Sequence, residues 1–235
     1  MPRFPLLLLY LAFWPCLAAD SFSPEQRTEI EAIVSDYVAS HPEIIVRALQ
    51  KLEENETQRH AGLVRLTGQK LREDPDAPRI GGSGRRNYIV DIFDFNCGFC
   101  KVMEPLFARA LEEYDLQLIY VDLPVVAESS RQIGVIAQAV YNLEPDKYFQ
   151  FHRIFMSRRE REAPLDFIRQ QLEDLGVAWD EVLEEMRSGR PQEQIARYLK
   201  LGAELGVRGT PYLIINGSEF RGAIQNYEDL RGLLR

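Results

Sequence analysis

Apolar and polar residues recur along the chain with two different periods, and each period predicts a different kind of element. Ser-Pro-Glu-Gln at 23–26 supplies an N-cap, a first-turn proline and a capping-box glutamine, so a helix is predicted to begin there. A second helix restarts at 40–43. It carries one apolar seam at a/d-like spacing, which Glu56 and Arg59 interrupt; the seam consists of Ile45, Leu49, Leu52, Leu63 and Leu66.

This helical region has two interpretations. It can be an amphipathic helix that folds on its own domain, or a stalk through which copies of the chain associate. We favour the stalk because the region is long, charged and apolar on one stripe only. Asp-Pro-Asp-Ala-Pro at 74–78, followed by a glycine-rich segment at 81–84, predicts a linker and a domain boundary.

The remaining chain reads strand, helix, strand, helical block, hairpin, helix. Residues 88–93 form an almost continuous apolar run, typical of a strand buried on both faces. Asp91 is the anomaly inside it, because a buried carboxylate is costly unless it is paired, solvated or useful. Residues 116–123 predict a second central strand and 129–205 a helical block. Asn-Gly at 216–217 is the turn of a final hairpin.

The first nineteen residues are predicted to be a secretory signal peptide. They contain one charge, an apolar run from Phe4 to Trp14, and small residues before a cleavage site near Ala18 or Ala19. An uncleaved anchor is the alternative, although the run is short for a membrane span. Attachment of lipid at Cys16 is disfavoured because bulky residues precede that cysteine. We therefore expect an exported, periplasmic protein.

Charge and cysteine content narrow the classes of function. The 235 residues include 28 Lys and Arg against 36 Asp and Glu, a net charge of −8, which argues against a nucleic-acid partner. Three cysteines are too few for a disulfide scaffold. Without Cys16 only Cys97 and Cys100 remain, and the three histidines lie far from them in sequence, so a four-ligand zinc site is excluded. The pair is a redox site, a two-ligand metal site or a coincidence.

The position of the pair favours redox chemistry. Cys97 is predicted where a strand ends and a helix begins, so its sulfur faces the free N–H groups and the positive end of the helix dipole. Cys100 lies one turn further on and can close a disulfide with it. Cys97 is therefore predicted to be the exposed attacking thiol, and Cys100 the shielded resolving thiol that releases a client protein.

Four further features accompany the pair. Asp91 lies six residues before Cys97, Lys101 directly follows Cys100, and Pro105 lies five residues after Cys100. The fourth is the segment Gly-Thr-Pro at 209–211, before the final hairpin. Together with the cysteines they resemble the thioredoxin fold. The resemblance implies a buried acid at Asp91, a proline kink at Pro105 and a cis proline at Pro211 that packs against the disulfide. The backbone before Pro211 would then pair with an extended substrate segment.

Cys100 and Pro211 are 111 positions apart, which leaves room for the helical block, an arrangement similar to the DsbA-like exported oxidoreductases. The segments 94–101 and 206–211, with the N-terminal helices, look most like the ScsC-like branch, whose members can oligomerise through that extension. We expect an α/β protein, a thioredoxin fold with an all-helical insertion at about 129–205. Its predicted parts are a signal peptide at 1–19, a helical extension at 20–74 and a thioredoxin-like domain at 75–235.

Two departures from the family pattern matter. The dipeptide Gly98-Phe99 lacks the histidine of strongly oxidising members, and the acid is Asp91 rather than glutamate, so its role as a proton relay is a hypothesis. Thr210, Gly98 and Phe99 are the predicted substrate-binding residues. Phe99 and Tyr212 either form an apolar rim for unfolded clients or simply pack.

The predicted function is exchange of the Cys97–Cys100 disulfide with cysteines of client proteins, by oxidation or isomerisation. Its expected partners are unfolded or misfolded exported proteins, a membrane redox partner that resets the disulfide, and further copies of the chain bound through residues 23–73. We expect no cofactor, no resident metal and no nucleic acid. The alternative function is binding of Cu(I) by the same two thiolates.

Overall fold

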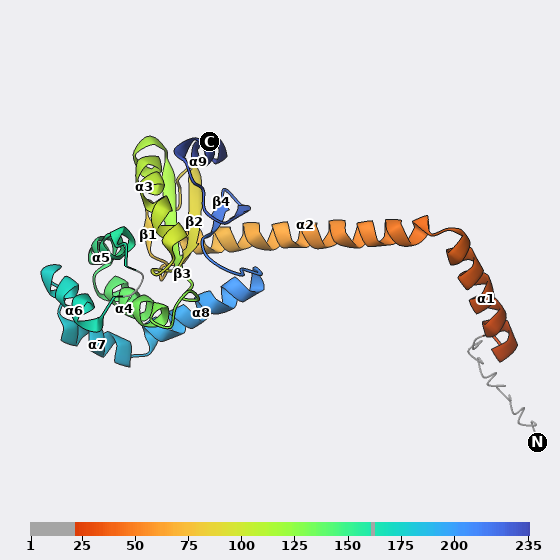
Figure 1. Ribbon diagram of the computed structural model, residues 1–235, viewed down its shortest axis with the longest axis horizontal. Coiled ribbons are helices and arrows are strands. Elements are labelled where there is room, and N and C mark those ends of the chain that lie inside the picture. The colour runs from red at the N-terminus through yellow and green to blue at the C-terminus, as the bar shows by residue number, and fades with distance from the viewer. Residues whose placement is uncertain (1–21, 161–162) are drawn as a thin grey trace, which may run out of the picture. The chain divides into compact units, whose positions relative to one another are not determined.

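The computed structural model describes residues 22–160 and 163–235 (Figure 1). The described chain divides into two units, with the division between Glu54 and Asn55. The predicted signal peptide lies outside the described residues. Among the helices that are described, none is both long and apolar enough to cross a membrane.

Two helices begin the described chain. Helix α1 spans Pro24–Ser40 and α2 spans Glu43–Glu73. The predicted capping box is present, because the Ser23 hydroxyl accepts a bond from the Gln26 N–H while the Gln26 side chain accepts one from the Ser23 N–H. None of the residues of α1 is buried.

The last part of α2 presents two different faces. Val64, Gly68 and Leu71 are buried. Leu63 and Leu66, which belong to the apolar seam, remain 37% and 54% exposed. The end of α2 therefore does fold onto its own domain, but through a face other than the apolar seam.

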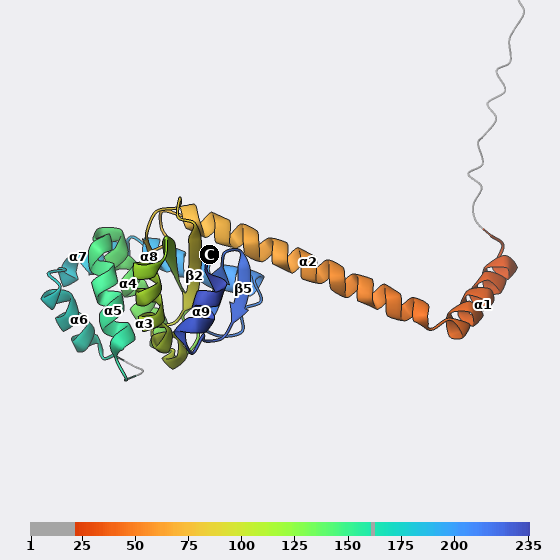
Figure 2. The same cartoon turned by 90° about the horizontal axis from the view of Figure 1, so that it is seen from above.

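A five-stranded sheet lies at the centre of the second unit. Its order is β1-β3-β2-β4-β5, with β2 and β3 parallel and the other pairs antiparallel. Figure 2 shows β2 and β5 of this sheet from above. Every residue of β2 and β3 is buried, as their continuous apolar runs predict. The strands span Arg79–Ile80 (β1), Asn87–Phe93 (β2), Leu116–Asp122 (β3), Tyr212–Ile215 (β4) and Ser218–Arg221 (β5).

Helices cover both faces of the sheet and divide the core in two. Side chains of α3 (Gly98–Glu113) and α9 (Tyr227–Leu233) pack in one cluster with alternate residues of the central strands, including Ile89 and Leu213. The strand residues that face the other side of the sheet pack in a second cluster with the end of α2 and with α8 (Arg190–Glu204). Alternation along each strand thus supplies both cores.

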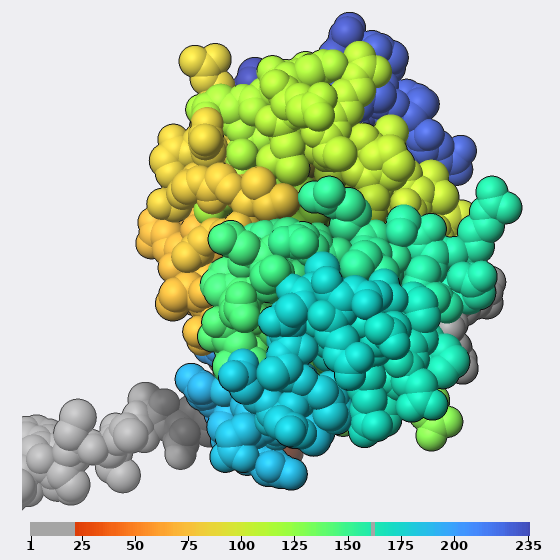
Figure 3. Space-filling view, turned by 90° about the vertical axis from the view of Figure 1, so that its left-hand side faces the viewer, coloured from red at the N-terminus to blue at the C-terminus, as the bar shows by residue number. Residues whose placement is uncertain are grey.

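The helical block between the second central strand and the hairpin is confirmed. It comprises α4 (Ser130–Leu143), α5 (Pro145–Ser157), α6 (Leu165–Asp174), α7 (Trp179–Arg187) and α8. In Figure 3 these helices, coloured green to blue, form a continuous surface below α3, coloured yellow-green. The structure is the predicted thioredoxin fold with a helical insertion and N-terminal helices.

The final hairpin has the predicted Asn-Gly turn. Asn216 and Gly217 have φ values of 51° and 89°, the left-handed conformation that a two-residue hairpin loop needs. The Asn216 side chain also accepts a bond from the Tyr88 N–H, which ties the turn to the start of β2.

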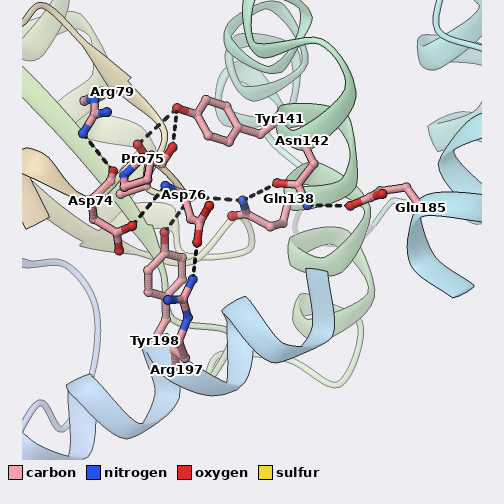
Figure 4. A network of polar contacts seen from close by, with 11 residues as sticks. Asp74, Pro75, Asp76, Arg79, Gln138, Tyr141, Asn142, Glu185, Arg197 and Tyr198 are labelled. Atoms are coloured by element: carbon pink, nitrogen blue, oxygen red, sulfur yellow. Dashed lines mark hydrogen bonds and ion pairs between the residues drawn. The ribbon is translucent and has the colours of Figure 1, made fainter. Parts of the chain in front are cut away.

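The segment expected to be a linker is held firmly within the second unit (Figure 4). The Asp76 carbonyl accepts bonds from Gln138 and Tyr198, and the Asp76 carboxylate pairs with Arg197 at 2.7 Å. Tyr141 donates to backbone carbonyls on either side of Asp76. The prolines end α2 as expected, but the polar contacts fix the chain that follows.

Candidate functional site

Cys97 is the N-cap residue of α3, at the point where the loop after β2 turns into the helix. Its extended backbone lets the free N–H groups of Phe99 and Cys100 face its sulfur. Its side chain makes no capping bond. Cys97 is only 5% exposed, so the sulfur is approached over a narrow area.

Cys100 lies beneath Cys97 and is fully buried. Both cysteines are free thiols in this structure. Burial raises the pKa of Cys100 far above its usual range, and its bond to Cys97 and the nearby Asp91 carboxyl act in the same direction. The two thiols thus differ in pKa and in burial. Cys100 is shielded as expected, but Cys97, expected to be exposed, is itself buried apart from a small area of its surface.

The pKa of Cys97 is lowered from 9.0 to about 6. The hydrogen bond from the Cys100 side chain is the main cause; it outweighs the opposing effect of burial, and the N–H groups at the start of α3 add to it. A large fraction of Cys97 is therefore thiolate at neutral pH. The folded, reduced protein gains this stabilisation fully above pH 9 and loses it as the pH falls through 6.

Alkylation of the reduced protein by iodoacetamide is expected to follow this titration. Because only the thiolate attacks, the rate should rise with pH through a midpoint near 6. Cys100→Ala removes the main hydrogen-bond donor, so the midpoint should move up towards 9.0. A midpoint near 9 in the unaltered protein would contradict this geometry.

The segment before β4, at Thr210 and Pro211, contacts the cysteine pair through Cys97. The Thr210–Pro211 peptide bond is cis, as the resemblance implies. In its protonated form, the Cys97 thiol donates to the Thr210 carbonyl across 3.3 Å. The structure therefore brings the cysteine pair, Cys97 and Cys100, together with the pair Thr210 and Pro211. The two pairs lie more than a hundred positions apart in the sequence.

Asp91 is buried in β2, and its carboxyl oxygens have no hydrogen-bond partner among the described residues. Burial raises its pKa well above the usual range, and the charges of Glu104 and Cys97 raise it further. The protonated form of Asp91 is thus favoured by burial, and more strongly while Cys97 is a thiolate. Its charge in turn acts on the pKa of Cys100, which places it within electrostatic reach of the shielded thiol.

Asp94 is the functional-site residue that the sequence reasoning missed. It is completely buried, and its carboxylate accepts bonds from the N–H groups of Asn96, Val125 and Val126 and from the Ser130 hydroxyl, at 2.8 Å each. These bonds join the loop that carries Cys97 to the loop after β3. The only sequence signal is an aspartate two residues before a backbone N–H that it can bond.

Lys101 is neither a free surface residue nor in contact with the sulfurs. Its ammonium donates to the carbonyls of Arg158 and Glu160 at 3.1 Å each, so it joins α3 to the end of α5. On the same side of α3, Glu104 bonds His152 at 3.0 Å beside a cavity of about 520 Å³. His152 is buried, and the sequence reasoning gave it no role.

Exposed apolar side chains stand on the two segments that Asp94 joins. Phe99 is 66% exposed and Val102 is 54% exposed on α3, while Val125 and Val126 are exposed on the loop after β3. Tyr212 is instead 2% exposed, so of the two residues considered for an apolar rim only Phe99 is on the surface.

Metal binding by a larger ligand set finds no support in the part of the chain that the structure describes. Three or more His, Cys, Asp or Glu side chains are nowhere gathered there in a group that could hold an ion. A two-thiolate site at Cys97 and Cys100 is a separate question, because it needs only those two ligands.

These features define a thioredoxin-fold protein with a C-x-x-C site. A family model described as a DSBA-like thioredoxin domain matches residues 89–235, and one described as the N-terminal domain of the copper resistance protein ScsC matches residues 26–59. The chain belongs to the DSBA-like thioredoxin domain family. The predicted resemblance to the ScsC-like branch of DsbA-like proteins is confirmed.

Solved structures agree with this assignment. A linker-deletion variant of ScsC from Proteus mirabilis is 24% identical and has a TM-score of 0.65, over 92% of this chain and 96% of that one. The thiol-disulfide exchange protein alpha-DsbA2 from Wolbachia pipientis is 25% identical with a TM-score of 0.67, over 76% and 95%. A periplasmic thioredoxin-like protein from Salmonella enterica serovar Typhimurium is 29% identical with a TM-score of 0.60, over 69% and 90%.

A curated Na⁺/H⁺ antiporter, NhaA 3 from Salinispora tropica, is 24% identical over 153 residues. The match covers 63% of this chain but only 23% of the antiporter, so the chain spans about a quarter of that relative. The similarity concerns a part of the antiporter chain, and its transport activity is not carried over to this protein.

Proposed function

We propose that this protein is an exported thiol-disulfide oxidoreductase that exchanges the Cys97–Cys100 disulfide with cysteines of client proteins. One observation carries the proposal: a thiol with a pKa of about 6 stands over a fully buried second thiol and against the Thr210 carbonyl. A structural pair would not need one sulfur held as thiolate, and a three-residue spacing braces almost nothing.

The exchange proceeds through a mixed disulfide. When the site is oxidised, a client thiolate attacks the Cys97 sulfur, the Cys97–Cys100 bond breaks, and Cys100 leaves as a thiolate that takes up a proton. A second client thiolate then attacks the client sulfur of the mixed disulfide, which forms the client disulfide and releases Cys97 as a thiolate. The reverse sequence reduces or reshuffles a client disulfide. The low pKa of Cys97 makes it the better leaving group in the release step.

Asp91 is proposed to exchange the proton of Cys100. The negative charge of the Cys97 thiolate raises the pKa of Asp91, and formation of the mixed disulfide removes that charge. Asp91 therefore ionises more easily when Cys100 has to lose its proton and resolve the mixed disulfide, and it holds a proton once Cys97 is a thiolate again.

Asp91→Asn is expected to slow resolution of the mixed disulfide by roughly 10–100-fold, the usual scale of a lost general base. The first attack by Cys97 should stay within about threefold of normal, because its thiolate is stabilised mainly by Cys100. Single-turnover release of a fluorescent client thiol separates the two steps. An unchanged release rate would exclude Asp91 as the proton relay.

The client-binding surface is proposed to surround Cys97. Phe99 and Val102 on α3 and Val125 and Val126 on the loop after β3 expose apolar area, and unfolded chains expose apolar side chains that this area can cover. Thr210 and the open backbone at Gly98, where an added methyl group would meet nothing within 4 Å, offer room for an extended segment.

Self-association through residues 23–73 is proposed for the N-terminal helices. The seam residues Ile45, Leu49 and Leu52 are each about half exposed or more. Burial of such a seam between copies is the ordinary way to stabilise a long helix with few contacts of its own. Several redox sites on one assembly favour isomerase work, because together they can hold one misfolded client.

The proposed location is the periplasm, with a membrane protein that resets the disulfide as redox partner. Support comes from the signal-like residues 1–19 and from the similarity to a periplasmic thioredoxin-like protein. Whether the pair donates or reshuffles disulfides depends on its reduction potential against that of the partner.

Recovery of a scrambled disulfide substrate is the experiment that tests this function. The full chain should restore activity to the substrate, and Leu49→Lys with Leu52→Lys should lower both the mass of the particle and the rate of recovery. Cu(I) binding by the same thiols is the second candidate, favoured by two free soft ligands at one site. Tight one-to-one copper binding without any recovery of substrate would replace the oxidoreductase proposal.

A further inference from the structure

A polar cluster joins α2 to the strand that follows Pro211. One carboxylate oxygen of Glu219, in β5, lies 2.9 Å from His60 Nε2, in α2. The same oxygen accepts a bond from the Tyr212 hydroxyl at 2.7 Å and bonds from the Arg221 guanidinium at 3.1 and 3.2 Å. A carboxylate only accepts hydrogen bonds, so His60 Nε2 carries a proton and donates.

The charges in this cluster favour an ionised Glu219. Partial burial by itself would raise the pKa of Glu219, but the bonds from His60, Tyr212 and Arg221 outweigh it and lower the pKa to about 2. Burial raises the pKa of Tyr212, and its bond to Glu219 raises it further. Tyr212 therefore remains a hydroxyl donor to a carboxylate, the stronger kind of hydrogen bond.

Close packing holds α2 against the same strand. Val64 and Leu71 belong to one buried cluster with Tyr212 and Ile214. Between them on the helix, a side chain at Gly68 would come within 2.8 Å of the Tyr88 hydroxyl and 3.0 Å of Ile214. Glycine at this position lets the helix backbone lie directly on the sheet.

The cluster is connected to the redox site by two peptide bonds. Tyr212 directly follows Pro211, and the Thr210 carbonyl before it accepts the bond from the Cys97 thiol. In the sheet, Tyr212 pairs with Ile92 of β2, near the end of the strand that leads to Cys97. Tyr212 therefore links the cluster covalently to the residue whose carbonyl faces the reactive sulfur.

We propose that α2 is a positioning element of the redox site: His60 and Glu219 hold Tyr212 in place and thereby set the position of the Thr210 carbonyl against Cys97. We name these three residues the α2 clamp. Release of the clamp changes the reactivity of Cys97 although none of its members touches a sulfur. For client exchange the inference rests on the proposed function, but its effect on Cys97 does not.

The test uses single substitutions in the full chain. Tyr212→Phe removes only the hydroxyl, and Glu219→Gln removes the charge. Both should move the pH midpoint of Cys97 alkylation by about half a unit or more and change the equilibrium constant with glutathione by about threefold. Glu54→Gln is the matched control on α2, because its exposed carboxylate pairs only with Lys51 and should leave both values unchanged.

His60 is tested by rescue. His60→Phe should reproduce the shift in the Cys97 midpoint, and His60→Gln, whose amide can donate in place of Nε2, should restore much of it. Gly68→Ala should act in the same direction by lifting α2 from the sheet, whereas Gly62→Ala, with nothing within 4 Å of the added carbon, should not.

The outcomes separate the clamp from the proposed function. A fall in melting temperature with an unchanged Cys97 midpoint and glutathione equilibrium would give these residues a purely structural role and overturn the inference. Shifts in both values support the clamp even if the unaltered protein fails to recover a scrambled substrate, a result that would count against the proposed function alone.

Discussion

Cys97→Ser is expected to lower the rate of disulfide exchange with a client by on the order of 10³-fold or more, because the hydroxyl that replaces the thiol cannot form or accept a disulfide. The substitution removes the one sulfur that combines a pKa of about 6 with access to the surface. Recovery of a scrambled substrate and direct exchange with a fluorescent disulfide peptide both measure the loss.

Cys100→Ser separates attack from resolution. The variant should still form mixed disulfides through Cys97, and these should persist because no second thiol remains to release the client. Non-reducing gels then show client-sized additions that disappear with reductant. The two variants thus have opposite signatures. A Cys97 variant that retains exchange, or a Cys100 variant that traps nothing, would show that the two sulfurs do not divide attack and resolution between them.

Asp94→Ala is expected to lower the free energy of unfolding by about 3 kcal/mol or more. Four donors lose one buried carboxylate, and bonds to a charged group contribute roughly 1.5–3 kcal/mol each before the structure relaxes. The loop that carries Cys97 and the loop with Val125 also lose their connection. Exchange should therefore weaken even where the variant is fully folded.

Urea unfolding of the reduced protein measures the effect on stability, with the slope of the transition used to check two-state behaviour. Asp115→Ala is the matched control. That carboxylate also bonds a backbone N–H and an arginine, but it lies at the surface, so its removal should cost far less. Equal losses in the two variants would contradict the importance assigned to burial of Asp94.

Residues at fixed offsets from the cysteines could be predicted from the sequence. Cys97, Cys100 and Pro211 belong to short local patterns, and Asp91 interrupts an apolar run, so each gives a signal within a few residues. The strands, the helical insertion and the Asn-Gly hairpin were predictable for the same reason, because their periodicity and turn residues are local.

Contacts between distant segments could not be predicted in this way. Glu219 and His60 are 159 positions apart, and each reads as an ordinary surface residue. The sequence did not indicate which face of α2 is buried, because the stronger apolar stripe runs along another side of the helix. Strand β1 could not be predicted either, because it has only two residues in a segment rich in proline and glycine. Two residues are too few to show a hydrophobic period.

The docking of α2 also determines where the catalytic part can be separated from the rest of the chain. A fragment that starts at the proline-rich segment near residue 75 leaves Tyr88 and Ile214 without the helix that covers them. Such a fragment is expected to aggregate through this bared apolar surface. We therefore expect the shortest fragment that folds by itself and holds the cysteine pair to begin near Asn55, where the second unit starts.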